Sequence, residues 1–298
     1  MPYTTSDLLS EIKQRSATPE SQETYTNASF LRLATNELYN YIVPLLTKTR
    51  EEYLIREKDY TLTSDTTYVV LPERSVGSGA RDVFYIDANG DAQSVAYLDS
   101  EQRERGNSAS YARQFMVYFK WDQLVLVGQV PPGGLRISYY CRPGQLIETS
   151  AAGLITAIDT GTGEVTLSSV PSTFTTATPL DIISSKGTYP YHEIDQTPTA
   201  VSATSVTFST LPTDLIVGDY ITLSDQSPLP QIPREFQPIL AQRTVVKVLE
   251  SQGDHAALDR AKIDLAEMEN GVMSLIHPRL QGEPKKIVSG MASRGWWA

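Results

Sequence analysis

The stretch DHAALDRAKIDLAEMENGVMSL, residues 254–275, decides the fold class of this 298-residue chain. Asp254 is a good N-terminal cap, and the apolar residues after it recur at spacings of three and four, which places them on one face of an α-helix. The members of this apolar seam are Leu258, Ala261, Leu265, Met268, Val272 and Leu275. So regular a seam needs a partner helix to cover it. The chain is therefore predicted to contain a helical part.

Working outward, two more helical segments are predicted close to the chain ends. One precedes the seam and covers about residues 234–251, with Gly253 placed to end it. The other is a short N-terminal helix that carries Leu8, Leu9 and Ile12, with Thr5 or Ser6 as its cap.

A longer helix is predicted from the cap Asn27 to about Arg56. Pro44 lies inside it, and a proline in a helix interior predicts a kink or a break. Its apolar face is predicted to consist of Leu31, Ala34, Leu38, Tyr41 or Ile42, and Leu45.

The middle of the chain has alternating β patterns instead. Residues 60–72 are interpreted as a strand pair, and residues 87–91 as the turn of a hairpin built around Asn-Gly. Further strands predict an antiparallel meander, and they cover residues 83–86, 94–98, 115–119, 123–127 and 135–141.

An internal repeat follows the meander. Residues 165–171, VTLSSVP, match residues 206–212, VTFSTLP, and each copy closes on a further strand, at 180–183 or 220–223. Two similar three-strand units predict a small barrel or sandwich made of two related halves.

This order of segments predicts an α+β protein: a helical bundle made from both chain ends, with a large antiparallel β insertion that is barrel-like or sandwich-like. The predicted divisions are a helical core built from residues 1–58 and 228–281, a β insertion at 59–227, and an extended tail at 282–298. The insertion divides into the meander, 59–143, and the two-copy repeat, 144–227.

Composition restricts the function. The net charge is −10, and tight binding to nucleic-acid backbones requires clustered Lys and Arg, so we do not expect the chain to grip them. No apolar run is long enough to cross a bilayer and the N-terminus lacks a signal-peptide pattern, so we expect a soluble protein that does not contact membranes. Cys141 is the only cysteine, which excludes an internal disulfide and fits a reducing compartment.

The residue types that carry chemistry are scattered. His192, His255 and His277 have no second His or Cys at ligand spacing. The glycine-rich stretch 77–81 lacks the lysine and the following helix of a nucleotide-binding loop. Acidic groups such as Glu51-Glu52 are typical of solvated surface. We therefore expect no catalytic residue, cofactor or metal, and the chain is not predicted to be an enzyme.

The layout of the two ends resembles the head-to-tail connector, or adaptor, proteins of tailed bacteriophages. The resemblance is carried by the capped N-terminal helix, by residues 30–38, FLRLATNEL, by the closing helical pair around 245–249 and 258–262, and by a tail that contains Lys285-Lys286 and Trp296-Trp297. The β insertion is larger than the one a minimal adaptor carries, and the resemblance does not indicate what the insertion contacts.

The resemblance implies a virion protein at the head–tail junction, made in the cytoplasm of the bacterial host. It implies a homo-oligomeric ring with twelvefold symmetry beneath the portal protein, in contact with tail or nozzle proteins. Double-stranded DNA would pass through the ring without specific binding, and an acidic wall favours such passage by repulsion.

Two sets of contact residues follow from this hypothesis. Four seam residues, Leu258, Leu265, Met268 and Val272, are expected at the interface between subunits. The tail is expected to dock on the portal through the side chains of Lys285, Lys286, Arg294, Trp296 and Trp297.

Other classes of function remain open. A phage tail, fibre or capsid-decorating protein would explain the Ser/Thr/Val strands equally well, and the insertion could then be a receptor- or carbohydrate-contacting module. A hydrolase acting on cell-wall polymer needs paired catalytic carboxylates, and the sequence nominates no such pair.

Overall fold

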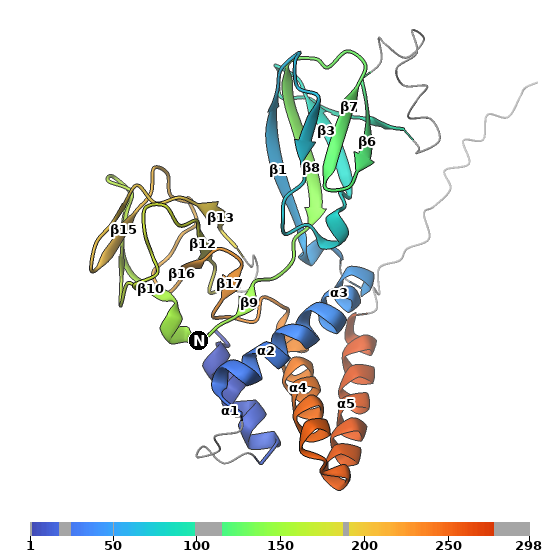
Figure 1. The fold of residues 1–298 in the computed structure, drawn as a ribbon, viewed down its shortest axis with the longest axis vertical. Helices are drawn as coiled ribbons and strands as arrows, with labels where there is room; N and C mark the ends of the chain where they lie inside the picture. Colours follow the sequence, from blue (N-terminus) through green and yellow to red (C-terminus); the bar gives the residue numbers. More distant parts are fainter. Residues whose placement is uncertain (1, 18–24, 50, 99–114, 187–190, 277–298) are drawn as a thin grey trace, which may run out of the picture.

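The computed structural model describes residues 1–298 except 1, 18–24, 50, 99–114, 187–190 and 277–298. The fold is α+β with several antiparallel sheets, as predicted. The helices lie together at one end of the molecule, and two separate β modules lie side by side beyond them (Figure 1). We call these the sandwich, built from residues 55–140, and the curled module, built from residues 153–223.

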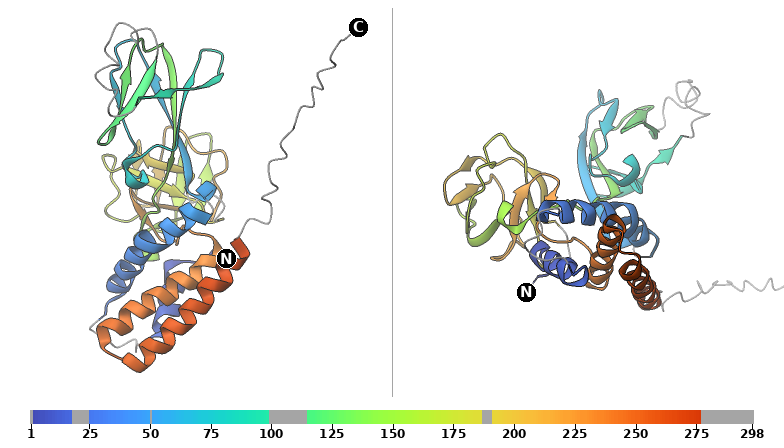
Figure 2. Two further views of the ribbon diagram at one scale, coloured as in Figure 1. Left: turned by 90° about the vertical axis from the view of Figure 1, so that its right-hand side faces the viewer. Right: turned by 60° about the horizontal axis from the view of Figure 1, so that its bottom comes forward.

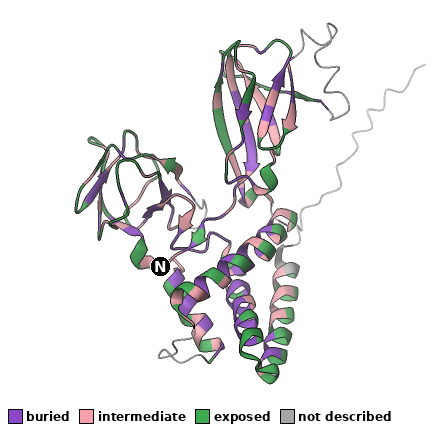
Figure 3. Ribbon diagram, viewed as in Figure 1, coloured by how far each residue is buried: buried purple, intermediate pink, exposed green. Residues whose placement is uncertain are grey.

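The helical part comprises α1 (Thr5–Arg15), α2 (Asn27–Glu37), α3 (Val43–Thr49), α4 (Gln237–Gln252) and α5 (His255–Ile276). Helix α4 is the central helix, because it contacts α1, α2 and α5. Its apolar side chains are largely buried, whereas α5 exposes most of its surface (Figure 3). Residues from both chain ends share one hydrophobic cluster, which includes Leu8, Ile12, Phe30, Leu38, Phe236, Leu240, Val248 and Leu258.

The helix caps differ slightly from the prediction. Thr4, rather than Thr5 or Ser6, caps α1 in a capping box with Asp7. Thr26, one residue before the predicted Asn27, caps α2 and accepts from the backbone N–H of Ser29. Gly253 ends α4 in the left-handed conformation with φ 74°, as predicted.

The predicted helix from Asn27 to Arg56 is interrupted and shorter. A π-helical turn, η1 (Leu38–Ile42), separates α2 from α3, directly before Pro44. The helix ends at Thr49 and is followed by the short 3-10 helix η2 (Glu51–Tyr53). A proline has no N–H for the helix ladder and its ring clashes with the carbonyl four residues earlier. The predicted kink or break takes the form of a π-helical turn, and the chain stays helical through Pro44 to Thr49.

The sandwich consists of two four-stranded sheets with the orders β1-β8-β3-β4 and β2-β7-β6-β5. Their facing side chains form a separate hydrophobic cluster that includes Val83, Val117, Leu124, Leu135 and Ile137. The strands are β1 (Ile55–Leu62), β2 (Tyr68–Val70), β3 (Asp82–Ile86), β4 (Ala92–Ser94), β5 (Ala96–Tyr97), β6 (Met116–Lys120), β7 (Gln123–Val127) and β8 (Gly133–Tyr140).

Two predictions about this module are wrong. The segments in residues 60–72 do not pair with each other, because β1 pairs with β8 and β2 pairs with β7 in the other sheet. The chain therefore alternates between two layers instead of forming a meander, which places apolar side chains from both sheets in one core. The predicted hairpin over residues 87–91 is confirmed, since β3 and β4 pair antiparallel around it.

The curled module is a seven-stranded sheet with the order β13-β12-β16-β10-β11-β15-β14. Its first and last strands, β13 and β14, are joined by only residues 197–199, so the sheet bends back on itself. The strands are β10 (Gly153–Asp159), β11 (Glu164–Leu167), β12 (Leu180–Ile183), β13 (Glu193–Gln196), β14 (Ala200–Val201), β15 (Ser205–Thr207) and β16 (Tyr220–Leu223).

The two repeat segments occupy equivalent places in this sheet. Val165 of β11 pairs with Val206 of β15, its counterpart in the sequence match, and β12 pairs with β16 so that Ile182 faces Ile221. Within each half, the first strand forms a hairpin with the second: β10 pairs with β11 in one half, and β14 pairs with β15 in the other. This pairing relates the halves by an approximate twofold axis.

The chain between the modules contributes to the helical core. Leu146, which the prediction placed in the β insertion 59–227, belongs to the helical cluster, together with Leu54 from the predicted helical core. Leu146 lies in β9 (Gln145–Leu146), which pairs in parallel with β17 (Gln226–Ser227), and its backbone N–H donates to the Thr35 hydroxyl. Both modules thus emerge from the same side of the helical part (Figure 2).

Candidate functional site at the junction of the modules

The most extensive polar network of the described residues is centred on Arg74, in the turn between β2 and β3. Its guanidinium enters the curled module, where Nη1 lies 2.6 Å from an Asp181 carboxylate oxygen and Nη2 lies 3.1 Å from one of Asp195. Nη2 also donates to the Ser224 hydroxyl at 2.8 Å. The Arg74 side chain is 5% exposed and that of Asp181 is 0% exposed. The ion pair is therefore buried and joins the two β modules.

Backbone groups of the curled module and of the residues directly after it hold the carboxylates that surround Arg74. Asp181 lies on β12 and accepts hydrogen bonds from the backbone N–H groups of Asp195 and Asp225. Asp195 and Asp225 both adopt left-handed φ angles, 57° and 63°. Residues in that region carry backbone strain, and strain of this kind persists where the surroundings fix it.

The protonation states of the pair follow from burial and charge. Burial raises the pKa of the Asp181 carboxyl, and the hydrogen bond and charge of Arg74 act against that rise. Burial lowers the pKa of the Arg74 guanidinium, but the hydrogen bond and charge of Asp181 outweigh burial and raise it. Asp181 thus depends on Arg74 to remain charged, whereas the Arg74 guanidinium is protonated in either case.

A polar cleft of about 750 Å³ adjoins this network, between the sandwich and the curled module. Its walls include Arg56 and Lys58 of β1 and Glu193 and Asp195 of β13. Arg56 also links the two modules, because its guanidinium donates to the backbone carbonyls of Tyr191 and His192 at 3.0 and 3.1 Å. The cleft walls are therefore tied together by charged side chains.

His192 is held between two carboxylates. Its Nε2 lies 2.9 Å from Asp219 and its Nδ1 lies 3.0 Å from Asp214. Burial lowers the pKa of His192, but the hydrogen bond and charge of Asp219 and the charge of Asp214 outweigh burial and raise it. The side chain is 4% exposed, a burial that the spacing of histidines in the sequence does not indicate.

This histidine is not arranged as the base of a catalytic triad. The Ser185 hydroxyl donates to Asp219 at 2.8 Å, on the carboxylate that also holds His192. In a triad the histidine contacts the serine, and the carboxylate lies behind the histidine. Because both ring nitrogens of His192 face carboxylates, the arrangement holds the loop to β16 and does not activate Ser185.

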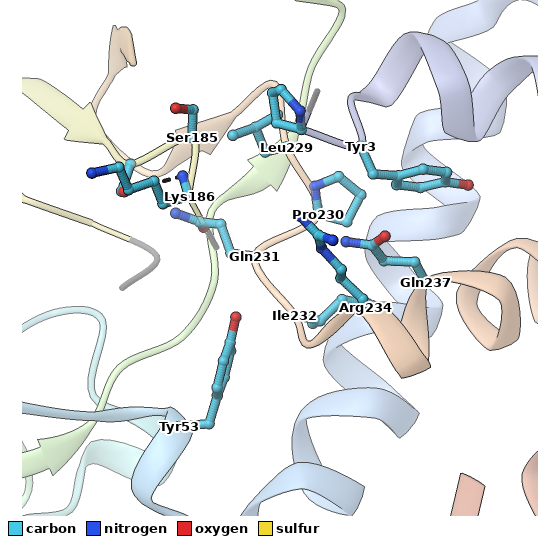
Figure 4. A pocket seen from close by; sticks show the side chains of 12 residues that line it. Tyr3, Tyr53, Ser185, Lys186, Leu229, Pro230, Gln231, Ile232, Arg234 and Gln237 are labelled. Carbon is cyan, nitrogen blue, oxygen red and sulfur yellow. Dashed lines mark hydrogen bonds between the residues drawn. The ribbon is translucent and has the colours of Figure 1, made fainter. Parts of the chain in front are cut away.

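A smaller cavity of about 220 Å³ lies where the N-terminus, the curled module and the start of α4 meet. In Figure 4, Arg234 and Gln237 lie next to each other on one wall, and the Tyr53 hydroxyl points into the cavity from the opposite side. Lys186 and Ser185 also line it. The lining is mixed, because Leu229, Pro230 and Ile232 contribute apolar surface beside these basic, hydroxyl and amide groups.

The predicted interface residues contact the rest of their own chain. Leu258 is 8% exposed and belongs to the helical cluster, and Leu265, Met268 and Val272 are partly buried against that cluster. Helix α4 is therefore the partner of the seam in the subunit. Contact of these residues with a second copy stays a prediction.

The predicted portal-docking residues, Lys285, Lys286, Arg294, Trp296 and Trp297, lie outside the described residues, and so does His277. The glycine-rich stretch 77–81 lies between β2 and β3, where η3 (Val76–Ser78) precedes the strand. Arg81, at the end of this stretch, pairs with Glu51 at 2.9 Å.

The sequence offered no periodic signal for the Arg74 network. Arg74 and Asp181 are 107 residues apart, and neither lies in a recognisable motif. A single arginine among turn residues and an aspartate within an apolar strand, Leu180–Ile183, are the only local hints. An aspartate in the middle of such a strand requires a buried partner.

Among the described residues, no group of three or more His, Cys, Asp or Glu side chains is arranged to hold a metal ion. The same residues contain no helix with the length and apolar composition that crossing a bilayer requires. Comparison of the chain with protein-family models and with the sequences of curated proteins finds no match.

Proposed function

We propose that this protein is a structural virion component, the ring-shaped head-to-tail adaptor beneath the portal of a tailed bacteriophage. In this proposal twelve copies form a ring at the head–tail junction after synthesis in the host cytoplasm. The ring contacts the portal on one side and tail or nozzle proteins on the other, and it performs no enzymatic reaction.

The observation that carries the proposal is the position of the two chain ends. Helix α1 and helix α2 from the N-terminal end pack on α4 from the C-terminal end in one hydrophobic cluster. Both β modules leave this cluster on the same side (Figure 2). The layout supports a helical bundle made from both chain ends as the ring-building core, with the β modules projecting from it.

The charge of the chain is compatible with DNA passage. With a net charge of −10, the chain repels phosphate backbones at long range and offers little to bind them. An adaptor must let a duplex slide through its ring, so weak interaction with DNA is the property required.

The proposal is tested by electron microscopy of portal-bearing heads incubated with the purified protein. We expect a ring with the radial symmetry of the portal, located beneath it. A bound complex without radial symmetry would contradict the proposal.

The role of the tail has its own test. A variant that lacks residues 283–298 should remain folded but should no longer attach to portal-bearing heads. The matched control replaces Trp296 and Trp297 with serine and keeps the length and the lysines, and we expect it to attach weakly, since aromatic anchors dominate such interfaces. Unchanged attachment of both variants would show that the tail does not dock on the portal.

One observation favours a second candidate, a tail, fibre or decorating protein with a β binding module. Trp121 is 81% exposed at the turn between β6 and β7, and its φ is +58°. Exposed tryptophan at the end of a rigid module is typical of contact surfaces. A trimer in particles, instead of a portal-matched ring, would support this candidate.

A further inference from the structure

The helix that precedes the sandwich buries an unusual set of side chains. Every fourth residue from 30 to 46 is completely buried, namely Phe30, Ala34, Leu38, Ile42 and Leu46. In a regular α-helix a step of four residues advances about 400°, so such a set drifts by about 40° at each step. The π-helical turn η1 compensates for this drift, because Val43 donates to the carbonyl of Leu38, five residues earlier.

The same segment contains a second apolar face. Leu31, Ala34, Leu38, Tyr41 and Leu45 follow the spacing of three and four that an uninterrupted α-helix needs, and this face matches the one predicted from the sequence, in which Tyr41 and Ile42 are alternatives. In the structure Tyr41 and Leu45 are only half-buried, and each lies one residue before the buried Ile42 or Leu46. The sequence therefore supplies apolar side chains for two registers that differ by one residue.

Pro44 determines which register is favoured. In a regular helix its ring would clash with the carbonyl of Asn40, and it has no N–H to donate to that carbonyl. The wider π-helical turn relieves this clash. Pro44 itself is exposed, so its effect is on the backbone and not on core packing.

The residues after the turn connect this register to the sandwich. Helix α3 leads into Glu51, whose carboxylate accepts from Arg81 at 2.9 Å and from the Tyr140 hydroxyl at 2.5 Å. Tyr140 is the last residue of β8, and it pairs with Ile55 at the start of β1. A shift of one residue rotates α3 by about 100° relative to α2 and must move this attachment.

On the other side, η1 contacts the central helices. The Arg243 guanidinium of α4 lies 3.4 Å from the centre of the Tyr41 ring. Arg243 also pairs with Glu37 of α2 at 2.8 Å and with Glu269 of α5 at 2.9 Å. A change of register therefore alters contacts in the helical part and in the sandwich together.

We propose that residues 38–49 form a two-register helical switch that couples the packing of the helical part to the orientation of the sandwich. The π register, with Ile42 and Leu46 inward, is the one in the structure. The second register is a continuous α-helix with Tyr41 and Leu45 inward. Pro44 biases the subunit towards the first register.

The first test measures a distance between the two parts. Spin labels are attached at Gln93→Cys in the sandwich and Asp259→Cys in α5, two exposed positions, in a Cys141→Ala background. The parent is expected to show one main distance population. Pro44→Ala should add a second population, because it removes the penalty on the regular helix.

The control for this test is Leu45→Asn added to Pro44→Ala. It places a polar group inward only in the second register, so the added population should disappear. An unchanged single population in the Pro44→Ala variant overturns the proposal. A broadened distribution that Leu45→Asn does not remove also overturns it, because it shows general loosening.

A second measurement keeps Pro44 and needs only thermal unfolding. If one register exists, the double variant of Leu45→Asn and Leu46→Asn should lose no more Tm than the sum of the single losses, since both side chains pack against the same hydrophobic cluster and share part of its burial. If two registers exist, the Leu46→Asn variant adopts the second register, in which residue 46 does not point inward, and it therefore loses little stability. The double variant should then lose clearly more than the sum, and additive losses overturn the proposal.

Discussion

At the residue scale, Arg74 and Asp181 form a buried ion pair between the β modules. Both side chains are almost fully buried. A hydrophobic cluster that contains Tyr139 of the sandwich and Ile183 and Tyr220 of the curled module also joins the two modules. Removing one partner of a buried ion pair is costly because the remaining charge loses both its partner and water.

Arg74→Met should destabilise the protein by about 3–5 kcal/mol, since Asp181 stays buried without its cation. Asp181→Asn added to Arg74→Met should restore part of this loss. The measurement is urea unfolding of the full chain. The control is Arg136→Met, which removes an exposed ion pair with Asp59 and should change stability little. Equal effects of Arg74→Met and Arg136→Met would contradict the prediction.

His192 should make stability depend on pH. Its pKa is raised above the usual 6.5 in the folded state, so its contribution is complete below that pH and is lost as pH rises through the raised pKa. Asp219, whose pKa is lowered mainly by the His192 hydrogen bond acting against burial, contributes above 3.8 and loses its contribution in acid.

We therefore expect the free energy of unfolding of the parent to fall as the pH rises above about 6.5, and His192→Gln to remove this fall. Denaturant unfolding across that range measures it. The matched control is His255→Gln, because His255 lies exposed at the start of α5. A fall that survives in His192→Gln would assign the pH dependence to another group.

At the element scale, the helices are determined by their caps and by the residues that interrupt them. Thr4 and Asp7 satisfy each other's backbone N–H groups at the start of α1, and the N–H of Thr5 donates to the carbonyl of Pro228. The cap thus fixes both the start of the helix and its attachment to the chain that leads into α4.

Thr4→Ala should lower stability by about 1 kcal/mol, because the N–H of Asp7 loses its acceptor. Thermal or urea unfolding measures the change. Ser10→Ala, at an exposed position within the same helix, is the control and should be neutral or slightly stabilising, since alanine has the higher helix propensity. A neutral Thr4→Ala would show that the cap is dispensable.

At the scale of the whole molecule, the chain enters and leaves the sandwich through two strands, β1 and β8, that pair with each other. Glu57 of β1 and Ser138 of β8 face each other across an antiparallel pair, close to where the chain leaves and re-enters the helical part. The sandwich has its own hydrophobic cluster. Two links to the curled module are the buried Arg74–Asp181 ion pair and the packing of Tyr139 against Ile183 and Tyr220.

Joining Glu57 to Ser138 by an Asn-Gly turn should leave the helical part and the curled module folded, provided that Asp181→Asn removes the carboxylate that Arg74 no longer neutralises. Circular dichroism and a cooperative melt measure this. The same excision with Asp181 kept is the matched variant, and we expect it to melt at a lower temperature. Loss of the cooperative melt in both would show that the sandwich is part of the core.

The sequence by itself determined the elements that depend on neighbours in the chain. Periodicity predicted α4 and α5, Gly253 the end of α4, and Asn-Gly the turn between β3 and β4. Pro44 predicted an interruption of the long helix that begins at Asn27. These features act over a few residues, so composition and spacing suffice to predict them. The α+β class followed from the same patterns.

Only the tertiary structure decided which strands pair, which register the long helix adopts, and where the charged network lies. The spacing of β1 and β2 suits a hairpin, but the two strands lie in different sheets of the sandwich. In this arrangement the inner faces of both sheets are buried in one core. Leu46 replaces Leu45 in the core because the π-helical turn shifts the register. Arg74 meets Asp181 because folding brings together residues 107 positions apart, and no local pattern records such a contact.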